Sequence, residues 1–274
     1  MSASEVPVCE LLAISARFPT TIHLSLDELA RHGGDTGPHR DGWGVAYLQD
    51  GDALVLREPD AASESRLLAC AKHTTLRSAT VVAHIRHATQ GPRMLRNTQP
   101  FARELGGRLH VFAHNGMLPG IEDDPRFSTR RFRRIGDTDS EHAFCALLDR
   151  IAPLWQHGAP SLEARIAEIG ALAAALRVLG PANFIYTDGD AVFAHGHRRR
   201  DGSGAIRPPG LHFVCRTCTG DSDGVALAGV SVGHDAQQQV AVVASVPLSD
   251  ERWEAIGEGE LVVLREGRVA LRSG

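Results

Sequence analysis

Four places in this 274-residue chain carry residue types that could do chemistry: Cys9, Arg86, Asn115-Gly116 and Asp139. A thiol can attack a carbonyl carbon, an amide or backbone N–H can hold the oxyanion that forms, and charged side chains can orient a substrate. Three of these places also have an ordinary structural explanation. Asn-Gly is the commonest two-residue hairpin turn, Asp139 could simply favour a helix N-terminus, and Arg86 could be a surface charge.

Two further patterns suggest binding chemistry but are incomplete. Cys215-Arg-Thr-Cys218 has the spacing of a metal or redox pair, yet no second Cys or His pair at a matching spacing accompanies it, so we expect no metal. Two cysteines three residues apart on one strand point to opposite faces, which favours packing over ligation. Arginine runs at residues 130–134 and 197–200 could meet phosphates, but the net charge of −4 and the 5% aromatic content favour a solvated face over a nucleic-acid site.

Considered together and in chain order, the candidate residues lie in four motifs. These are Cys9-Glu-Leu-Leu, His84-Ile-Arg-His-Ala-Thr-Gln-Gly91, Ala113-His-Asn-Gly116 and Gly136-Asp-Thr-Asp-Ser-Glu141. The series resembles the class II glutamine amidotransferases, which are N-terminal-nucleophile hydrolases. His39-Arg-Asp-Gly-Trp-Gly44, together with Ala244-Ser-Val-Pro-Leu248 and Trp253, is similar to the stand-alone branch of that family, in which no synthase domain follows.

The resemblance implies a catalytic role for three residues. Cys9 would supply the nucleophilic thiol, and its own α-amine, with a pKa of roughly 7.7–8.0 in model peptides, would act as the base. The side-chain amide of Asn115 and the backbone N–H of Gly116 would form the oxyanion hole, where each donor contributes about 3 kcal/mol to the transition state. No histidine partner, metal or cofactor is implied.

The resemblance also implies how the substrate would be bound. Arg86, with Thr89 nearby, would bind the α-carboxylate of the amino-acid end of the substrate, because a guanidinium can bind a carboxylate through two parallel hydrogen bonds. Asp139 would bind the α-ammonium group. Many members of the family carry His where this chain has Gln90, so the resemblance assigns no role to Gln90.

These roles predict an amidohydrolase that cleaves the side-chain amide of glutamine or of a γ-glutamyl compound through a γ-glutamyl thioester on Cys9. Hydrolysis of γ-glutamyl peptides in thiol metabolism is one alternative, and ammonia donation to a separate synthase is another. A catalytically silent binding or regulatory module is a third. A conventional Cys–His hydrolase that pairs Cys9 with His84, His87 or His114 is the rival that needs no free N-terminus.

Eight residues precede Cys9, and their peptide bond would turn the proposed base into a non-basic amide. We therefore expect residues 1–8 to be a removed leader or a mis-assigned start, and residues 9–274 to form the amidotransferase domain. The second possibility is favoured because Val8 could be read from a GTG initiation codon, which would yield Met-Cys. The segment also lacks the apolar periodicity that would dock it into a fold.

Composition places the chain among ordinary globular proteins, with 43% hydrophobic and 23% charged residues. No long apolar run or signal-peptide pattern is present, so the sequence favours a cytoplasmic protein. Lys72 is the only lysine, which excludes a Gly-Lys-Ser/Thr phosphate loop and makes pyridoxal chemistry improbable. Five cysteines, an odd number, favour free thiols.

Hydrophobic patterning predicts an α+β fold in one domain, and the resemblance makes this a four-layer αββα sandwich of the N-terminal-nucleophile type. Capping boxes predict helices from Ser25 and Thr138, and two further helices are expected near residues 63–71 and 161–179. Short apolar runs predict strands at residues 9–15, 45–48, 53–57, 80–86, 110–114, 184–187, 192–195, 211–215, 239–245, 261–264 and 269–271.

Overall fold

The computed structural model of the protein describes residues 9–24, 41–71, 76–86, 91–200, 204–217, 225–233 and 237–274. Its larger sheet contains β1 (Glu10–Leu24), β2 (Trp43–Gln49), β3 (Asp52–Glu58), β4 (Arg77–Ile85), β11 (His212–Thr217), β12 (Val225–Leu227), β13 (Val230–Val232), β14 (Gln239–Ala244) and β15 (Glu254–Ala255). The strand order is β15-β11-β14-β1-β4-β2-β3, and β13 joins β12 to the far end of β1. The strand that follows Cys9 therefore lies in the middle of this sheet.

The smaller sheet contains β5 (Phe101–Leu105), β6 (Arg108–Gly116), β7 (Ala182–Thr187), β8 (Val192–His195), β16 (Leu261–Arg265) and β17 (Arg268–Ser273). Its strand order is β17-β16-β8-β7-β6-β5, so β6 has a neighbour on each side. A separate two-stranded ribbon pairs β9 (Arg199–Arg200) with β10 (Ile206–Arg207).

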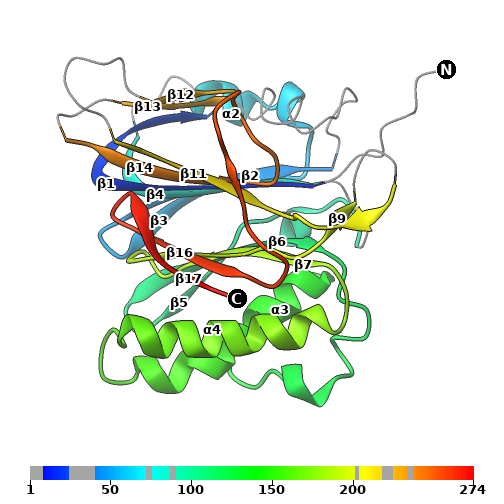
Figure 1. Ribbon diagram of the computed structural model, residues 1–274. Helices are drawn as coiled ribbons and strands as arrows, with labels where there is room; N and C mark the ends of the chain where they lie inside the picture. The colour runs from blue at the N-terminus through cyan, green and yellow to red at the C-terminus, as the bar shows by residue number, and fades with distance from the viewer. Residues whose placement is uncertain are drawn as a thin grey trace.

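The two sheets are stacked, with helices α3 (Asp139–Ile151) and α4 (Leu162–Arg177) on the outer side of the smaller sheet and α2 (Arg66–Ala71) on the outer side of the larger one (Figure 1). Single-turn 3₁₀ helices span Ala62–Glu64, Leu95–Asn97, Pro125–Phe127 and Ala152–Trp155. None of the helices in the described residues is long and apolar enough to cross a membrane. The mixture of helix and strand expected from the sequence is confirmed.

Three layers of apolar side chains hold these elements together. One fills the space between the sheets, and residues such as Leu11, Val111 and Ile185 point into it. A second lies between the smaller sheet and helices α3 and α4, and a third covers the outer face of the larger sheet. Because side chains alternate along a strand, β1 supplies Leu11 to the layer between the sheets and Leu12 to the outer layer.

Helix α3 begins as its capping pattern predicts. The Thr138 side chain accepts a hydrogen bond from the backbone N–H of Glu141 at 3.3 Å, which satisfies one of the otherwise unpaired donors of the first turn. Glu141 does not complete the reciprocal box. Its carboxylate instead accepts from the Gly136 N–H at 2.7 Å and pairs with the Arg103 guanidinium, so it ties the loop before α3 to strand β5.

Most predicted elements are confirmed within a few residues, including the hairpin of β2 and β3 and the helix α4, which is capped by Ser161. Strand β5 was not predicted, because the segment before the strand expected at residues 110–114 is polar; its Phe101 and Leu105 are buried, while Arg103 and Glu104 lie between them. The short strands β9, β10, β12, β13 and β15 were also not predicted. The capping box at Ser25 lies outside the described residues.

Candidate active site

Strand pairing brings Cys9 and Arg86 to the same end of two adjacent central strands, β1 and β4, of the larger sheet. Glu10 of β1 is directly opposite Ile85 of β4, so the residues just before β1 and just after β4 lie side by side. Burial lowers the pKa of the Arg86 guanidinium, while the negative charge of a Cys9 thiolate and the Asp41 carboxylate oppose that change. Cys9 and Arg86 are therefore close enough to interact electrostatically.

Asn115 comes to the same place from the smaller sheet. Its side-chain Nδ2 donates a hydrogen bond to the backbone carbonyl of Cys9 at 2.6 Å. Asn115 is 8% exposed and lies near the end of β6. The contact therefore joins the two sheets at the position of the candidate nucleophile.

Asn115-Gly116 is not a hairpin turn, as its dipeptide sequence alone would suggest. Both residues continue strand β6, opposite Asn183 and Ala182 of β7. Glycine is required at position 116 by a close approach, because a Cβ atom there would lie 1.8 Å from the carbonyl oxygen of Pro181. The backbone of this strand end therefore lies directly against the segment that leads into β7.

Arg86 is not a surface charge, since only 4% of it is exposed. Its guanidinium donates to the backbone carbonyls of Asp41 at 3.2 Å and Gly91 at 3.1 Å. These contacts hold a cation in a fixed orientation at the end of β4, which suits it to bind an anionic group. Thr89, predicted to assist it, lies outside the described residues.

Asp139 combines a helix-terminal position with contacts to the loop that follows β6. Its Oδ2 accepts from the Leu118 N–H at 2.8 Å, and its Oδ1 accepts from the Ser140 N–H at 2.8 Å. The carboxylate is 6% exposed. It therefore holds the chain just after Gly116 against the N-terminus of α3, and the helix dipole favours its negative charge there.

Sequence reasoning did not predict the hydrogen bonds behind Asp139. The Ser140 hydroxyl donates to Asp139 Oδ1 at 3.3 Å and contacts His114 Nδ1 at 2.9 Å. Burial lowers the pKa of His114, while the Asp139 carboxylate opposes that change. The only sequence signal was the position of these residues inside two of the recognised motifs.

His84 is a poor candidate for a catalytic base. It is fully buried, and neither ring nitrogen has a hydrogen-bond partner among the described residues. Burial lowers its pKa to about 3, and the positive charges of Arg86 and His114 act in the same direction. A histidine with so low a pKa is neutral near pH 7. It is nevertheless too weak a base to take a proton readily from a thiol. His87 lies outside the described residues.

We expect His84 to make the protein sensitive to acid. Its folded-state pKa lies below the roughly 6.5 of an unfolded histidine, so its contribution to stability is present above pH 6.5 and is lost as the pH falls toward 3. Between pH 7 and pH 5 this group should remove about 2 kcal/mol from the free energy of unfolding. Urea unfolding at both pH values should show a smaller loss for His84→Gln than for wild type, with exposed His157 changed to Gln as the matched control. Equal losses in wild type and His84→Gln would contradict this account.

Glu10, the residue after Cys9, is held by a partly buried ion pair. Its carboxylate accepts from the Arg199 guanidinium at 2.9 Å, and Arg199 also donates to the backbone carbonyl of Ser245 at 2.8 Å. The Ser245 hydroxyl in turn accepts from the Leu11 N–H at 2.9 Å. The start of β1 is therefore held by contacts from β9 and from the end of β14, which no sequence pattern indicated.

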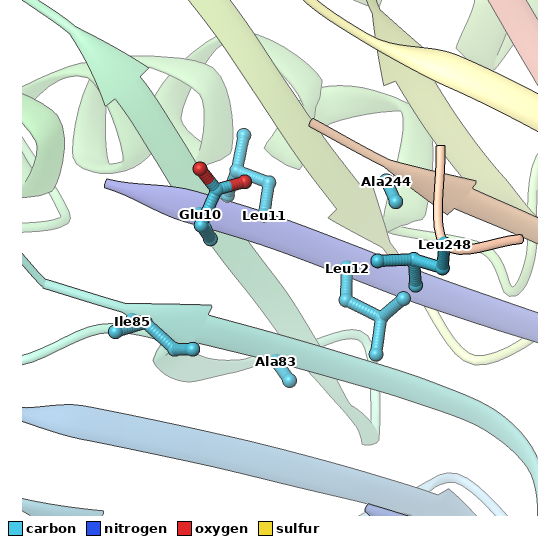
Figure 2. Close-up of a pocket in the computed structure, with 7 residues that line it drawn as sticks. All are labelled: Glu10, Leu11, Leu12, Ala83, Ile85, Ala244 and Leu248. Atoms are coloured by element: carbon cyan, nitrogen blue, oxygen red, sulfur yellow. The ribbon is translucent and has the colours of Figure 1, made fainter. Parts of the chain in front are cut away.

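A small apolar pocket lies beside Glu10 on the larger sheet. Its lining consists of Glu10 and six apolar residues from β1, β4, β14 and the segment after β14, among them Leu12, Ile85 and Leu248 (Figure 2). The pairing of Glu10 with Ile85 puts the pocket next to the strand ends that carry Cys9 and Arg86.

The other cysteines differ from Cys9 in their surroundings. Cys145 is completely buried in α3, and burial raises the pKa of its thiol to about 11. Cys215 is a free thiol at an exposed position of β11, where partial burial raises the pKa of the thiol. The Cys70 side chain and Cys218 lie outside what the structure describes, so the Cys215–Cys218 pair is not tested.

Comparison with known proteins shows the family. A family model described as "Glutamine amidotransferases class-II" matches residues 8–273. The Escherichia coli protein YafJ, assigned by name to the glutamine amidotransferases, is 34% identical over 258 residues, which cover 92% of this chain and 96% of YafJ. A crystal structure of a Pseudomonas aeruginosa protein described as a glutamine amidotransferase has a TM-score of 0.72 and 31% identity, covering 96% of this chain and 100% of that one.

A more distant likeness concerns the fold alone. The glutamine phosphoribosylpyrophosphate amidotransferase of B. subtilis has a TM-score of 0.55 and 15% identity, and the match covers 97% of this chain but 49% of that enzyme. The fold of this chain therefore corresponds to about half of a longer protein there. Because the family model spans almost the entire sequence and YafJ matches it at 34% identity, the chain belongs to the class II glutamine amidotransferases.

Proposed function

We propose that the protein is an amidohydrolase of the glutamine amidotransferase type, which cleaves the side-chain amide of glutamine or of another γ-glutamyl compound through a γ-glutamyl thioester on Cys9. The observation that supports this most strongly is the 2.6 Å contact between Asn115 Nδ2 and the Cys9 carbonyl. In this contact a hydrogen-bond donor from the smaller sheet reaches Cys9, the proposed nucleophile, at the start of a strand of the larger sheet.

In the proposed first step, the α-amine of Cys9 takes the proton of the Cys9 thiol, and the thiolate attacks the amide carbon of the substrate. The tetrahedral oxyanion collapses, the protonated α-amine gives its proton to the leaving nitrogen, and ammonia departs. Water, deprotonated by the same amine, then attacks the thioester carbon; the C–S bond breaks, the Cys9 thiolate takes the proton back from the amine, and glutamate is released. This sequence requires that Cys9 be the first residue, so we propose that the active domain comprises residues 9–274 without residues 1–8.

Asn115 can make its observed hydrogen bond and also donate one in the proposed oxyanion hole. A side-chain amide carries two N–H donors. One donates to the Cys9 carbonyl, and the second can donate to the oxyanion together with the backbone N–H of Gly116. Because these donors belong to a paired strand, little reorganisation is needed when charge develops.

Arg86 and Asp139 are the proposed substrate-binding residues. The buried guanidinium of Arg86 would bind the α-carboxylate, and the buried carboxylate of Asp139 would bind the α-ammonium group. Both are fixed by contacts to the backbone, so they can recognise an amino-acid end while Cys9 attacks the distant amide. Thr89 is proposed to assist Arg86.

We expect Arg86→Ala and Asp139→Asn to weaken substrate binding more than they slow the chemical step. Loss of a hydrogen bond to a charged group costs about 1.5–3 kcal/mol, so KM for glutamine should rise roughly 10- to 100-fold while kcat changes by a few-fold. Ammonia release measured against glutamine concentration gives both constants. The exposed neighbour Asp137→Asn is the matched control, and circular dichroism checks folding. An unchanged KM in Arg86→Ala would show that the carboxylate is bound elsewhere.

The function itself is tested by incubating the chain that begins at Cys9 with glutamine and measuring ammonia and glutamate. Hydroxylamine should intercept the thioester and yield γ-glutamyl hydroxamate. A panel of γ-glutamyl peptides then decides between glutamine and the thiol-containing γ-glutamyl compounds that are the alternative substrates. Binding of glutamine without turnover would instead indicate a silent regulatory module.

The ammonia that leaves the first step has two possible fates. We propose that it is released to solvent or passed to a separate synthase.

The arrangement of layers also belongs to the proposal. The stacked sheets, with α3 and α4 on one side and α2 on the other (Figure 1), support a four-layer αββα sandwich of the N-terminal-nucleophile type. For two of the three histidines the Cys–His rival is disfavoured, because burial lowers the pKa of His84 to about 3 and also lowers the pKa of His114.

A further inference from the structure

We propose that Gln99 and Asn183 are positioning residues. Their side-chain amides hold the end of β6 in the geometry needed for oxyanion binding. The inference rests on the proposed function, because it assigns a purpose to groups that contact Asn115 and its neighbours but do not themselves reach the reacting atoms. Strand β6 loses its partner strand β5 before its own end.

Strand β5 supports β6 only up to Phe112. Phe101, the first residue of β5, is opposite Phe112, so His114 lies beyond the last residue pair. At that point the Gln99 side chain replaces the missing strand. Its Oε1 accepts from the His114 N–H at 2.6 Å and its Nε2 donates to the His114 carbonyl at 3.0 Å. One side-chain amide thus satisfies both backbone groups, as an adjacent strand residue would.

Asn183 supports the next residue from the other side. Its Nδ2 donates to the Asn115 carbonyl at 3.2 Å and to the Arg198 carbonyl at 2.7 Å, while its Oδ1 accepts from the His197 N–H at 2.7 Å. Asn183 is 1% exposed, so these polar contacts are all made inside the protein. They join the backbone of Asn115 to the segment that leads into β9.

The surroundings of Asn183 are shaped to fit it. A Cβ atom at Gly210 would lie 1.7 Å from Asn183 Oδ1, so a larger residue there would displace the amide. Gln99 and Asn183 together hold the backbone of His114 and Asn115 between two amide side chains. An oxyanion hole depends on donors fixed before the reaction, and an error of about 1 Å in such a site can cost on the order of 100-fold in rate.

The chain contains a matched control for Gln99. Gln238 makes the same pair of contacts with Phe18 of β1, since its Oε1 accepts from the Phe18 N–H at 3.1 Å and its Nε2 donates to the Phe18 carbonyl at 3.0 Å. Both glutamines are buried. Phe18 is on the same strand as the start of the site but nine residues from Cys9, so the same substitution can be compared at the site and away from it.

The test compares Gln99→Glu with Gln238→Glu in the chain that begins at Cys9. An ionised carboxylate cannot donate to a carbonyl, so each change breaks half of one amide contact. We expect kcat for glutamine to fall about 10- to 100-fold in Gln99→Glu with KM within about 3-fold of wild type, and kcat to stay near wild type in Gln238→Glu. Equal loss of kcat in both variants, or none in Gln99→Glu, would overturn the proposal.

A second measurement keeps the inference separate from the proposed function. Hydrogen exchange of the peptide that contains residues 113–117 should accelerate in Gln99→Glu and in Gly210→Ala, and should stay at the wild-type rate in Gln238→Glu. If wild type releases no ammonia, the proposed function fails, but this exchange result still shows whether the amides hold the strand end. Unchanged exchange in Gln99→Glu would refute the positioning role whatever the activity.

Discussion

The chain that begins at Cys9 should release ammonia from glutamine at least about 100-fold faster than the chain that keeps residues 1–8. General-base catalysis contributes on the order of 10²–10⁴-fold in rate, and the peptide bond between Val8 and Cys9 removes the proposed base entirely. The shorter chain can be made by initiating at Met-Cys and allowing the initiator Met to be removed. Intact-mass analysis confirms the first residue of each preparation before the rates are compared.

Acetylation provides the control for this comparison. Blocking the α-amine of the shorter chain should reduce its activity to that of the longer one, because both then carry an amide nitrogen at Cys9. Equal activity of chains that begin at Met1 and at Cys9 would reject the amine as base. It would also return His87 and His114 to consideration as partners of the thiol.

Cys9→Ala should reduce amide hydrolysis by on the order of 10⁴-fold or more, since removal of a covalent nucleophile leaves only binding and electrostatic effects. The expected loss is in kcat, and the variant should still bind glutamine through Arg86 and Asp139. Isothermal calorimetry measures that binding, and hydroxamate formation in the presence of hydroxylamine should disappear.

Cys215→Ala is the appropriate comparison for this variant, because Cys215 is a free thiol at an exposed position of β11. It should keep wild-type kcat. Cys145→Ala is less useful because its side chain is completely buried, and the cavity left behind would lower stability. Appreciable ammonia release by Cys9→Ala would show that another group is the nucleophile.

The elements predicted from periodicity and capping correspond well to the structure because their causes are local. Thr138 caps α3 through a hydrogen bond three residues away, and the hairpin of β2 and β3 follows from alternation around Asp50-Gly51. Strand β5 was missed for the opposite reason. Arg103 and Glu104 make the segment look like a loop, and only pairing with β6 and the contact of Arg103 with Glu141 explain their place in a strand.

The candidate site also contains residues that the sequence revealed and residues that it did not. Cys9, Arg86, Asn115 and Asp139 were found through motifs, and the structure brings Cys9 together with Arg86 and Asn115. The residues behind them were not found. Gln99, Asn183 and Arg199 act through contacts with residues that are distant in the sequence, and neither residue type nor local spacing reveals such a partner. Thr89 remains a prediction.

The central position of β1 also constrains when the larger sheet can fold during synthesis of the chain. Leu12 is paired on one side with Ala83 and on the other with Ala244, so the strand that follows Cys9 is complete only when residues near both ends of the chain have met. Contacts over such sequence distances form late and slowly. In a nascent chain still attached to the ribosome, β1 can pair with β4 but its other side stays unpaired until β14 has emerged. We therefore expect a chain that ends before β14 to lack one of the two strands that hold the segment after Cys9.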